Sequence, residues 1–472
     1  MKLFGHYVAP LFLLLAAVDG ALFLAVLRLL SLGYHCHACY FGSLVNLRLY
    51  QAILLTGVFL LITISVGLYN ADALKSFRTF LGRLVTASQL IFIPTVLVVA
   101  VTKAAAGMPF GWYIGILSLA ILLFMAVQLV CRAVLIQFSR TRLLTKRIVV
   151  LGDGKMAAAV TEFLTRAGHT HLKHVQTISN SIVQENYLRT SSNLVLKIRQ
   201  EEPVTLSVVA QALKADEIVV AVEEKRGLPV HELLECKLKG IEVIDGLTFW
   251  EREAGLVDFS NVGAGWLTFS TGFVLDQPRR VLKRILDFVV GVGFLVAVLP
   301  LVLVVAAAIK LESPGPVFYR QDRVGLNGKV FRVWKFRSMR SDAEKDGVPR
   351  WAGANDDRVT RIGRFIRKVR IDEIPQIINV LAGDMSFIGP RPERPFFVDD
   401  LRKHIPYYDL RHRVRPGITG WAQVNYHYGA SIEDAKRKFA YDLYYVKKND
   451  LLLDCAILVQ TVRVILYAQG GR

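Results

Sequence analysis

Long apolar runs dominate the first 140 residues of the chain. Each reaches the roughly 20 residues that a membrane-spanning helix needs. The first run is too long for a cleaved signal peptide and contains Asp19. The pattern predicts a bundle of four transmembrane helices within residues 1–140. The apolar runs are residues 7–30, 47–69, 84–101 and 112–138.

Basic residues set the expected orientation of this bundle, because loops rich in Lys and Arg remain in the cytoplasm. One basic group separates the second and third runs, and another follows the fourth. We therefore expect both groups and the N-terminus in the cytoplasm. The two groups are Lys75, Arg78 and Arg83, and Arg140, Arg142, Lys146 and Arg147.

A fifth apolar stretch, residues 288–309, has a different pattern. Basic residues flank it on both sides, and one crossing cannot place both flanks in the cytoplasm. Pro300 lies near its middle, and proline disrupts a helix at the preceding turn. These features predict a re-entrant helix within residues 281–311, which bends at Pro300 and leaves on the face where it entered. A kinked ordinary span is the alternative.

Residues 141–255 alternate between short strand and helix patterns. This alternation predicts a small Rossmann-like domain with a parallel α/β sheet. Its first strand ends in Gly152-Asp153-Gly154-Lys155-Met156-Ala157, the G-x-G-x-x-A form of a dinucleotide-binding turn. No ribose-binding acid follows about 20 residues on, so we expect a structural turn without NAD. Residues 256–279 are expected to be a linker to a domain at 280–472.

The composition is typical of a membrane protein that binds phosphate groups. Of 472 residues, 53% are apolar, and 58 Lys and Arg exceed 39 Asp and Glu. This basic surplus indicates contact with inner-membrane lipid or a phosphorylated substrate. No helix-turn-helix or aromatic stacking platform is evident, so we expect no nucleic acid. His35, Cys36, His37 and Cys39 could hold a metal, a disulfide or two free thiols.

Phosphate chemistry concentrates in the last 190 residues. A strand pattern at 330–336 carries Lys335 and leads into Arg337, and both cations could neutralise a pyrophosphate. An amphipathic helix is predicted at 359–371 and would lie in the bilayer interface. Its expected apolar side is Val359, Ile362, Phe365, Ile366 and Val369, opposite Arg361, Arg364 and Lys368.

Asp372 and Glu373 follow this helix directly. A carboxylate can act as nucleophile in phosphoryl transfer, and a second carboxylate can hold Mg²⁺ against the phosphates. Arg391 and the upstream cations would take the remaining negative charge. The alternative, a solvated pair on a helix face, is common for such a dipeptide and stays open on these residues alone.

Five motifs together resemble the bacterial sugar transferase family, the monotopic-type polyprenyl-phosphate phosphoglycosyl transferases. With four spans before a small α/β domain, the chain resembles the large members of that family and is similar to undecaprenyl-phosphate glucose or galactose phosphotransferases. The C-terminal residues after Asp442 most resemble members found with exosortase systems. The motifs are Ser-Pro-Gly-Pro at 313–316, Lys-Phe-Arg-Ser-Met at 335–339, Asp-Glu-Ile-Pro-Gln at 372–376, Gly-Asp-Met-Ser-Phe-Ile-Gly-Pro-Arg-Pro at 383–392, and Arg-Pro-Gly-Ile-Thr-Gly-Trp-Ala-Gln-Val-Asn at 415–425.

The resemblance implies an enzyme that transfers a sugar 1-phosphate from a UDP-sugar to undecaprenyl phosphate, and so initiates exopolysaccharide or O-antigen repeat units. The nucleophile matches Asp372, which would release UMP, and the residue tied to Mg²⁺ matches Glu373. The implied substrate-binding residues are Lys335, Arg337, Arg367, Gln376, Asp384 and Arg391. The family also implies the bacterial inner membrane, a cytoplasmic catalytic domain and a homodimer. Leu299 replaces the Ser that many relatives have before the proline, and the sugar remains open.

Two rival functions remain for comparison. A membrane-anchored sugar-nucleotide dehydratase would need a Tyr-xxx-Lys pair near the glycine turn, but Tyr444 and Lys448 lie nearly 300 residues away. A scaffold with a decayed catalytic domain would not need an intact Asp372 and Glu373. Release of UMP from a UDP-sugar distinguishes the transferase from both.

Overall fold

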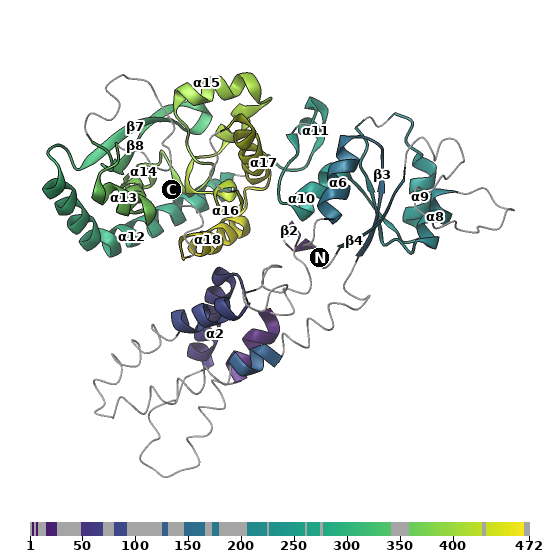
Figure 1. The fold of residues 1–472 in the computed structure, drawn as a ribbon, viewed down its shortest axis with the longest axis horizontal. Helices are drawn as coiled ribbons and strands as arrows, with labels where there is room; N and C mark the ends of the chain where they lie inside the picture. The colour runs from purple at the N-terminus through teal and green to yellow at the C-terminus, as the bar shows by residue number, and fades with distance from the viewer. Residues whose placement is uncertain are drawn as a thin grey trace, which may run out of the picture. The chain divides into compact units, whose positions relative to one another are not determined.

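The chain forms two compact units, residues 1–254 and residues 255–472. The fold is that of a computed structural model, drawn in Figure 1. It describes residues 2–3, 6–7, 16–25, 49–68, 80–91, 125–130, 146–165, 172–178, 205–223, 226–259, 262–273, 277–340, 358–426 and 431–466.

Helices occupy the described parts of the four N-terminal apolar runs. They are Ala16–Ala25, α2 (Leu49–Val66), Phe80–Ile91 and residues 125–130. Two short strands, β1 (Lys2–Leu3) and β2 (His6–Tyr7), pair antiparallel before them. The helical character of the runs agrees with the sequence, whereas the four-span bundle stays a prediction. The cluster around Cys36 lies outside the described residues.

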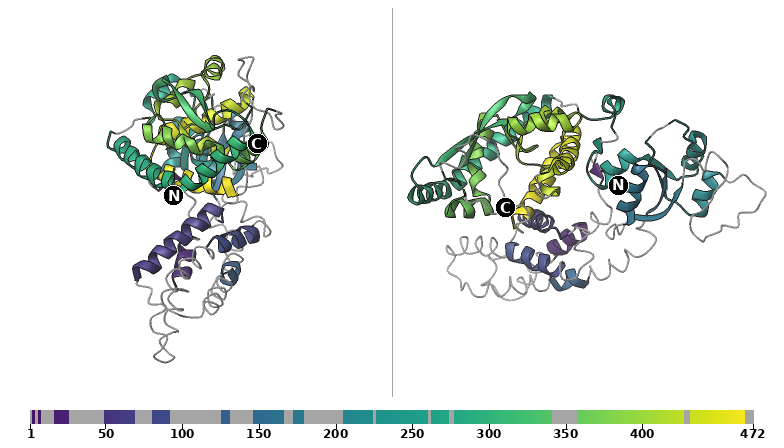
Figure 2. Two further views of the ribbon diagram at one scale, coloured as in Figure 1. Left: turned by 90° about the vertical axis from the view of Figure 1, so that its left-hand side faces the viewer. Right: turned by 45° about the horizontal axis from the view of Figure 1, so that its top comes forward.

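A four-stranded parallel sheet forms the middle domain, as predicted. The strand order is β4-β3-β5-β6. Helices α8 and α9 cover one face, where Leu206 and Cys236 pack against Val149 and Ile218. Helices α6 and α10 lie on the other face (Figure 1 and Figure 2). The elements are β3 (Lys146–Leu151), α6 (Lys155–Thr165), β4 (Leu172–Ile178), α8 (Leu206–Ala212), β5 (Glu217–Val220), α9 (Val230–Leu238), β6 (Glu242–Asp245) and α10 (Gly246–Glu253).

The glycine turn after β3 is closed by the chain itself. Gly152 has a φ of 145°, and a Cβ there would lie 2.3 Å from the Ala221 carbonyl oxygen. The Lys155 amide, at the start of α6, donates to the Glu223 carboxylate over 3.0 Å. Helix N-termini in dinucleotide-binding turns offer such amides to phosphate. The chain's own carboxylate uses this donor, which supports a structural role for the turn.

The second unit begins with α12 (Gln277–Glu312), a helix of 36 residues that contains Pro300. The helix continues through Pro300, and its two halves run in different directions (Figure 1). Both halves pack on the same unit: Gly291 faces Leu381 in the first half, and Ile309 packs near Ile366 in the second. The predicted helix is thus confirmed, and the return to one membrane face stays a prediction.

The rest of α12 is unusually apolar and exposed. Among the described residues, α12 is the one helix that is long and apolar enough to cross a membrane. Phe288, Val296 and Val304 are 51%, 68% and 66% exposed. An apolar surface of this extent on a soluble protein would normally be covered by lipid or a partner.

Beyond α12, two small sheets and a set of short helices carry the family motifs. Strand β7 (Phe318–Val324) pairs antiparallel with β8 (Val330–Phe336), and β9 (Ser386–Ile388) pairs parallel with β10 (Gly417–Thr419). The remaining elements are α11 (Ala264–Phe269), η2 (Leu326–Gly328), α13 (Arg361–Lys368), η3 (Ile371–Gln376), α14 (Ile377–Ala382), α15 (Pro395–His404), η4 (Tyr408–Arg413), α16 (Trp421–Asn425), α17 (Ile432–Lys448) and α18 (Leu451–Leu466).

The stretch predicted as a linker, residues 256–279, has a different role in the structure. The Gly255 carbonyl accepts a 2.6 Å hydrogen bond from Trp421 Nε1, and the Val257 amide donates to Ala440. The Lys447 ammonium lies 4.1 Å from the Trp266 ring centroid. The described part of this stretch therefore packs on α16 and α17 as part of the second unit, and Gln277 already belongs to α12.

Candidate active site

The segment before the two carboxylates is a short helix fixed at its start. The Thr360 hydroxyl accepts a 2.9 Å hydrogen bond from the Gly363 amide, which caps α13. Glu312, the last residue of α12, accepts from the Ile362 amide over 3.1 Å. A Cβ on Gly363 would lie 2.0 Å from the Ser338 carbonyl oxygen, so α13 packs directly on the chain that leaves β8.

The amphipathic helix is shorter than the sequence predicted, and its apolar side is divided. Helix α13 ends at Lys368, and Arg370 has a left-handed φ of 57° that turns the chain into η3. Ile366 is buried near the second half of α12, whereas Phe365 is 61% exposed and Val369 is 41% exposed. The predicted amphipathic helix is therefore present with shorter bounds, Arg361–Lys368, and its position in the bilayer interface stays a prediction.

The turn at Arg370 directs Asp372 and Glu373 into the unit, where both are buried. Three cations surround Glu373. Lys335 Nζ lies 3.4 Å from Oε1, Arg370 lies 3.6 Å from Oε2, and Arg391 donates to both oxygens. Burial opposes ionisation of Glu373, but Arg391, Lys335 and Arg370 outweigh it and hold its pKa well below the usual range.

Asp372 has the opposite electrostatic setting. Burial and the adjacent Glu373 charge raise its pKa, and Lys335, Arg367 and Arg391 offset this only in part. No described residue forms a hydrogen bond or ion pair with its carboxyl group. Burial also lowers the pKa of Lys335. Glu373 is thus ionised and ion-paired, whereas Asp372 has no direct ion pair with a described residue. Both are buried, so the solvated-pair alternative is wrong.

The loop that carries Arg391 is fixed by the motif at 415–425. Strand β9 leads into this loop, and β10, which belongs to the motif at 415–425, pairs with β9. The Gly417 amide donates to the Pro390 carbonyl over 3.0 Å. A Cβ on Gly417 would lie 2.1 Å from the Gly389 nitrogen, and a Cβ on Gly389 would lie 2.2 Å from the Arg415 carbonyl oxygen. Only glycine allows the two segments to approach so closely.

Two further buried residues support the site, and sequence reasoning missed both. Arg411 donates to the Arg391 carbonyl over 2.8 Å and pairs with Asp442 at 2.9 Å. Burial raises the pKa of Asp442 to about 6, although Arg411 opposes this shift. Asn379 accepts from the Trp334 amide at 3.0 Å and donates to the Arg332 carbonyl at 2.8 Å, which joins α14 to β8. Their positions between family motifs were the available signal.

The remaining predicted site residues are placed differently. Arg367 is close enough to lower the pKa of Asp372. Gln376 is buried at the end of η3. Asp384 is exposed and lies 3.5 Å from the Asn379 side-chain nitrogen. Pro300 lies inside α12 and is not one of the polar residues of the site.

Arg337 was predicted to bind phosphate, and the structure places its guanidinium elsewhere. It donates to the carbonyls of Ser313 and Pro314 over 2.7 and 2.9 Å, and also to the Ser313 hydroxyl. These acceptors lie just beyond the end of α12, and Ile309 within α12 adds a longer contact of 3.4 Å. The prediction is corrected, because Arg337 is buried and holds the Ser-Pro-Gly-Pro turn.

Glu373 is the residue that the sequence predicted to hold Mg²⁺. No group of three or more His, Cys, Asp or Glu that could hold a metal occurs among the described residues. Magnesium commonly takes one or two carboxylates together with substrate phosphates. A Mg²⁺ ion at Glu373 would therefore need phosphate or water oxygens for its other ligands, and it would compete with the cations around Glu373.

Comparisons with known proteins identify the family of this chain. The sequence profile described as bacterial sugar transferase matches residues 278–468, which include the site. An uncharacterized sugar transferase of Bacillus subtilis (strain 168) is 40% identical over 192 residues, which cover 40% of this chain and 90% of the relative. This chain belongs to the bacterial sugar transferase family.

Two larger relatives carry more specific names. The UDP-N-acetylgalactosamine-undecaprenyl-phosphate N-acetylgalactosaminephosphotransferase of Aeromonas hydrophila is 50% identical over 241 residues, 51% of this chain and 56% of the relative. The UDP-glucose:undecaprenyl-phosphate glucose-1-phosphate transferase of Escherichia coli (strain K12) is 40% identical over 235 residues, 49% of this chain and 50% of the relative. The chain thus spans about half the length of these two sugar transferases.

The structural role of Arg337 can be tested by its replacement with lysine. Arg337→Lys keeps the charge but loses the fork that reaches several oxygens, so we expect the free energy of unfolding to fall by about 2 kcal/mol. Affinity for UDP, measured by calorimetry, should stay within about twofold of the wild type. The matched control is Arg332→Lys at an exposed ion pair on β8, which should change neither quantity. A large loss of UDP affinity at unchanged stability would restore the phosphate-binding role.

The two carboxylates should have opposite effects on stability. The folded pKa of Asp372 is raised, so its contribution to stability is present at low pH and is lost as pH rises through that pKa. Asp372→Asn should therefore raise the melting temperature at pH 7–8, and the gain should shrink on acidification.

The folded pKa of Glu373 is lowered, so its contribution is present above its unfolded pKa, near about 4.3, and is lost as pH falls through the folded value. Glu373→Gln should cost about 3 kcal/mol at neutral pH, because three partly buried cations lose their partner. Thermal unfolding across a pH series measures both effects, and equal signs at neutral pH would contradict the division.

Proposed function

We propose that this protein transfers a sugar 1-phosphate from a UDP-sugar to undecaprenyl phosphate with release of UMP. Asp372 carries the proposal: it is a buried carboxyl without a clasping partner, next to a Glu373 held by three cations. Membership of the bacterial sugar transferase family and the names of the two larger relatives support this reaction. The product would be the first lipid-linked sugar of an exopolysaccharide or O-antigen unit.

In the first step, an oxygen of ionised Asp372 attacks the β-phosphorus of the UDP-sugar. The bond from this phosphorus to the oxygen shared with the α-phosphorus breaks, and UMP leaves with that oxygen and the electron pair. The phosphosugar remains on Asp372 as an acyl phosphate. Lys335 and Arg391 lie beside the pair and are suited to hold the diphosphate and the leaving UMP.

In the second step, a phosphate oxygen of undecaprenyl phosphate attacks the same phosphorus. The bond to Asp372 breaks, the carboxylate is regenerated, and the lipid leaves as a diphospho-sugar. Neither step consumes water or a redox partner, so the reaction balances with the two substrates alone. Burial of Asp372 also limits water, which would otherwise hydrolyse the acyl phosphate.

Magnesium would be held by Glu373, and when bound it would neutralise charge on the phosphates. The protein's own part is to keep Glu373 ionised, through Lys335, Arg370 and Arg391. Because Asp372 must be ionised to attack, its raised pKa places the acid limit of the reaction above the range of an ordinary aspartate.

The lipid substrate requires the site to lie at a membrane, and α12 supplies the apolar surface for it. We propose that α12 is re-entrant at the inner membrane, with the second unit on the cytoplasmic face. Both halves of α12 pack on one unit, which supports this arrangement. The four N-terminal spans complete the proposed multi-pass topology.

The covalent intermediate can be tested by intact-protein mass spectrometry. The full chain is mixed with UDP-N-acetylgalactosamine, UDP-glucose or UDP-galactose in the absence of lipid phosphate. We expect one of them to add the mass of its phosphosugar and to release UMP in equal amount. Asp372→Asn removes the nucleophilic oxygen and should give no adduct, with turnover lower by several orders of magnitude.

The matched control for this experiment is Asp399→Asn, which makes the same change at an exposed position on α15 and should retain the adduct. Glu373→Gln should slow adduct formation in a way that responds to magnesium concentration, whereas Asp372→Asn should not respond. An adduct that persists in Asp372→Asn would move the nucleophile elsewhere. UMP release only when lipid phosphate is present would favour direct attack by the lipid.

The topology of α12 gives a separate prediction. Single cysteines placed near Arg280 and near Arg320, in a background without native cysteines, should react with a membrane-impermeant thiol reagent only from the cytoplasmic side. Pro300→Leu should straighten the helix, because it restores the amide and removes the ring clash, and should abolish activity. Labelling of the Arg320 side from the periplasm of wild-type protein would contradict a re-entrant helix.

A further inference from the structure

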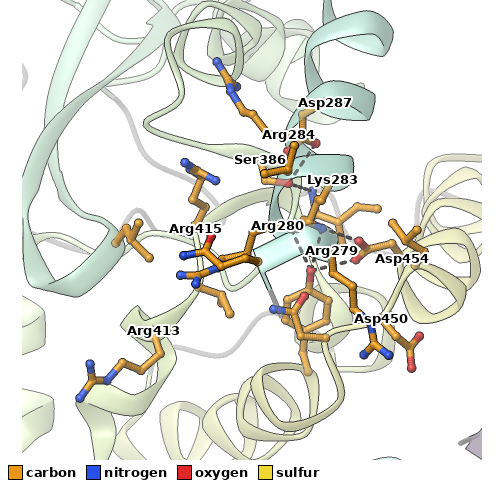
Figure 3. Close-up of a pocket in the computed structure, with 18 of the residues that line it drawn as sticks. Arg279, Arg280, Lys283, Arg284, Asp287, Ser386, Arg413, Arg415, Asp450 and Asp454 are labelled. Carbon is orange, nitrogen blue, oxygen red and sulfur yellow. Dashed lines mark hydrogen bonds and ion pairs between the residues drawn. The ribbon is translucent and has the colours of Figure 1, made fainter. Parts of the chain in front are cut away.

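We propose that a cavity at the start of α12 binds a phosphate group carried by a membrane lipid, at a site separate from Asp372 and Glu373. The cavity has a volume of about 430 Å³. Its walls are the first turns of α12, η2, the chain that follows η4, and the junction of α17 and α18 (Figure 3). The cavity is lined by none of Asp372, Glu373, Lys335 and Arg391, so it does not belong to the proposed transfer site.

Positive charge dominates this cavity. Two of its acids are already used: Asp287 accepts from the Ser386 hydroxyl at 3.0 Å, and Asp454 pairs with Lys283. Tyr445 also lies 2.8 Å from Asp454. The third acid, Asp450, accepts from the Leu453 amide at 2.8 Å. Six cations thus face three acids, so a positive excess remains for an anion. The six cations in the wall are Arg279, Arg280, Lys283, Arg284, Arg413 and Arg415.

Three of these cations are available to a ligand. Arg280 and Arg413 are exposed and form no hydrogen bond or ion pair with any residue that the structure describes. Arg415 uses Nε for the Gly383 carbonyl at 3.0 Å, and its two terminal nitrogens have no partner within the described ranges. Figure 3 shows all three on one side of the cavity. Guanidinium groups bind phosphate through paired donors, so this cluster is suited to a phosphate group.

The apolar part of the wall favours a phosphate attached to a lipid over a free one. Val281, Ile285 and Leu451 line the same cavity. Val281 and Ile285 are 56% and 52% exposed, and the exposed apolar surface of α12 continues from them through Phe288. The cations therefore lie where this surface begins, as a lipid headgroup lies relative to its chains. A free phosphate would leave the apolar wall exposed to water.

Polar contacts hold the α12 wall of the cavity in place. Arg284 donates to the carbonyls of Val380 and Leu381 at the end of α14, and Asp287 accepts from the Phe387 amide at 3.2 Å. These contacts fix the start of α12 without using Arg280 or Arg413. The cavity is therefore a preformed site, and neutralisation of those two arginines should leave the fold intact.

Native mass spectrometry of the full chain in a neutral detergent tests this site. The probes are dioleoyl phosphatidylglycerol, dioleoyl phosphatidylcholine, undecaprenyl phosphate and inorganic phosphate. The test variant combines Arg280→Gln and Arg413→Gln. The matched control combines Arg361→Gln and Arg364→Gln, which remove equal charge from exposed positions on α13. Equal melting temperatures of the three proteins establish that each is folded.

The wild type and the control should retain an anionic lipid, and the test variant should bind it on the order of tenfold more weakly. Phosphatidylcholine should bind weakly to all three. A loss confined to undecaprenyl phosphate identifies the ligand as that lipid, and a loss shared with phosphatidylglycerol identifies a general anionic headgroup. Equal binding by the test variant and wild type, or full displacement of lipid by an equal concentration of inorganic phosphate, would overturn the proposal. Lipid retention does not depend on transfer, so it can fail without affecting the proposed reaction.

Discussion

Two buried carboxylates that adjoin in the chain repel each other, and the site depends on how the protein resolves this repulsion. Glu373 receives the direct contacts of Lys335, Arg370 and Arg391, which keep it ionised. Lys335, Arg367 and Arg391 act on Asp372 only at longer range, and its pKa is raised. An unclasped carboxyl is a better nucleophile than one held in ion pairs, because its lone pairs are not already engaged. The division of roles between two similar residues therefore follows from where the cations lie.

The position of α12 is the second constraint, because this helix must connect a polar unit to apolar surroundings. On its inner side, Lys283, Arg284 and Asp287 bind Tyr445, α14 and Ser386. At its far end, Arg337 binds the Ser-Pro-Gly-Pro turn, and Glu312 receives the first turn of α13. Helix α13 leads to Asp372 through the turn at Arg370. The helix that provides the apolar surface thus also positions the chain that carries Asp372, the proposed nucleophile.

The sequence predicted what depends on periodicity, including the parallel sheet, α12 and strand β8. It predicted Lys335 and Arg391 as phosphate ligands, whereas the structure pairs both with Glu373. It failed where the outcome depends on which acceptor a side chain finds. The composition around Arg337 cannot distinguish a ligand phosphate from the chain's own carbonyls. The left-handed Arg370 is a conformation that few non-glycine residues adopt, so the early end of α13 had no local signal. Residues 256–273 lack a regular pattern, and long-range contacts such as Trp421 with Gly255 decide their packing.

The motif at 415–425 supports the candidate site by holding the loop that carries Arg391. Arg391 must reach Glu373 from a loop, and a loop by itself would leave the guanidinium free to move. Strand β10 pairs with β9, Gly417 donates to Pro390, and Arg411 donates to the carbonyl of Arg391 itself. Each contact removes freedom from the loop rather than adding charge to the site. The glycines in the two motifs then follow from geometry, since any side chain at Gly389 or Gly417 would separate the segments that hold Arg391 in place.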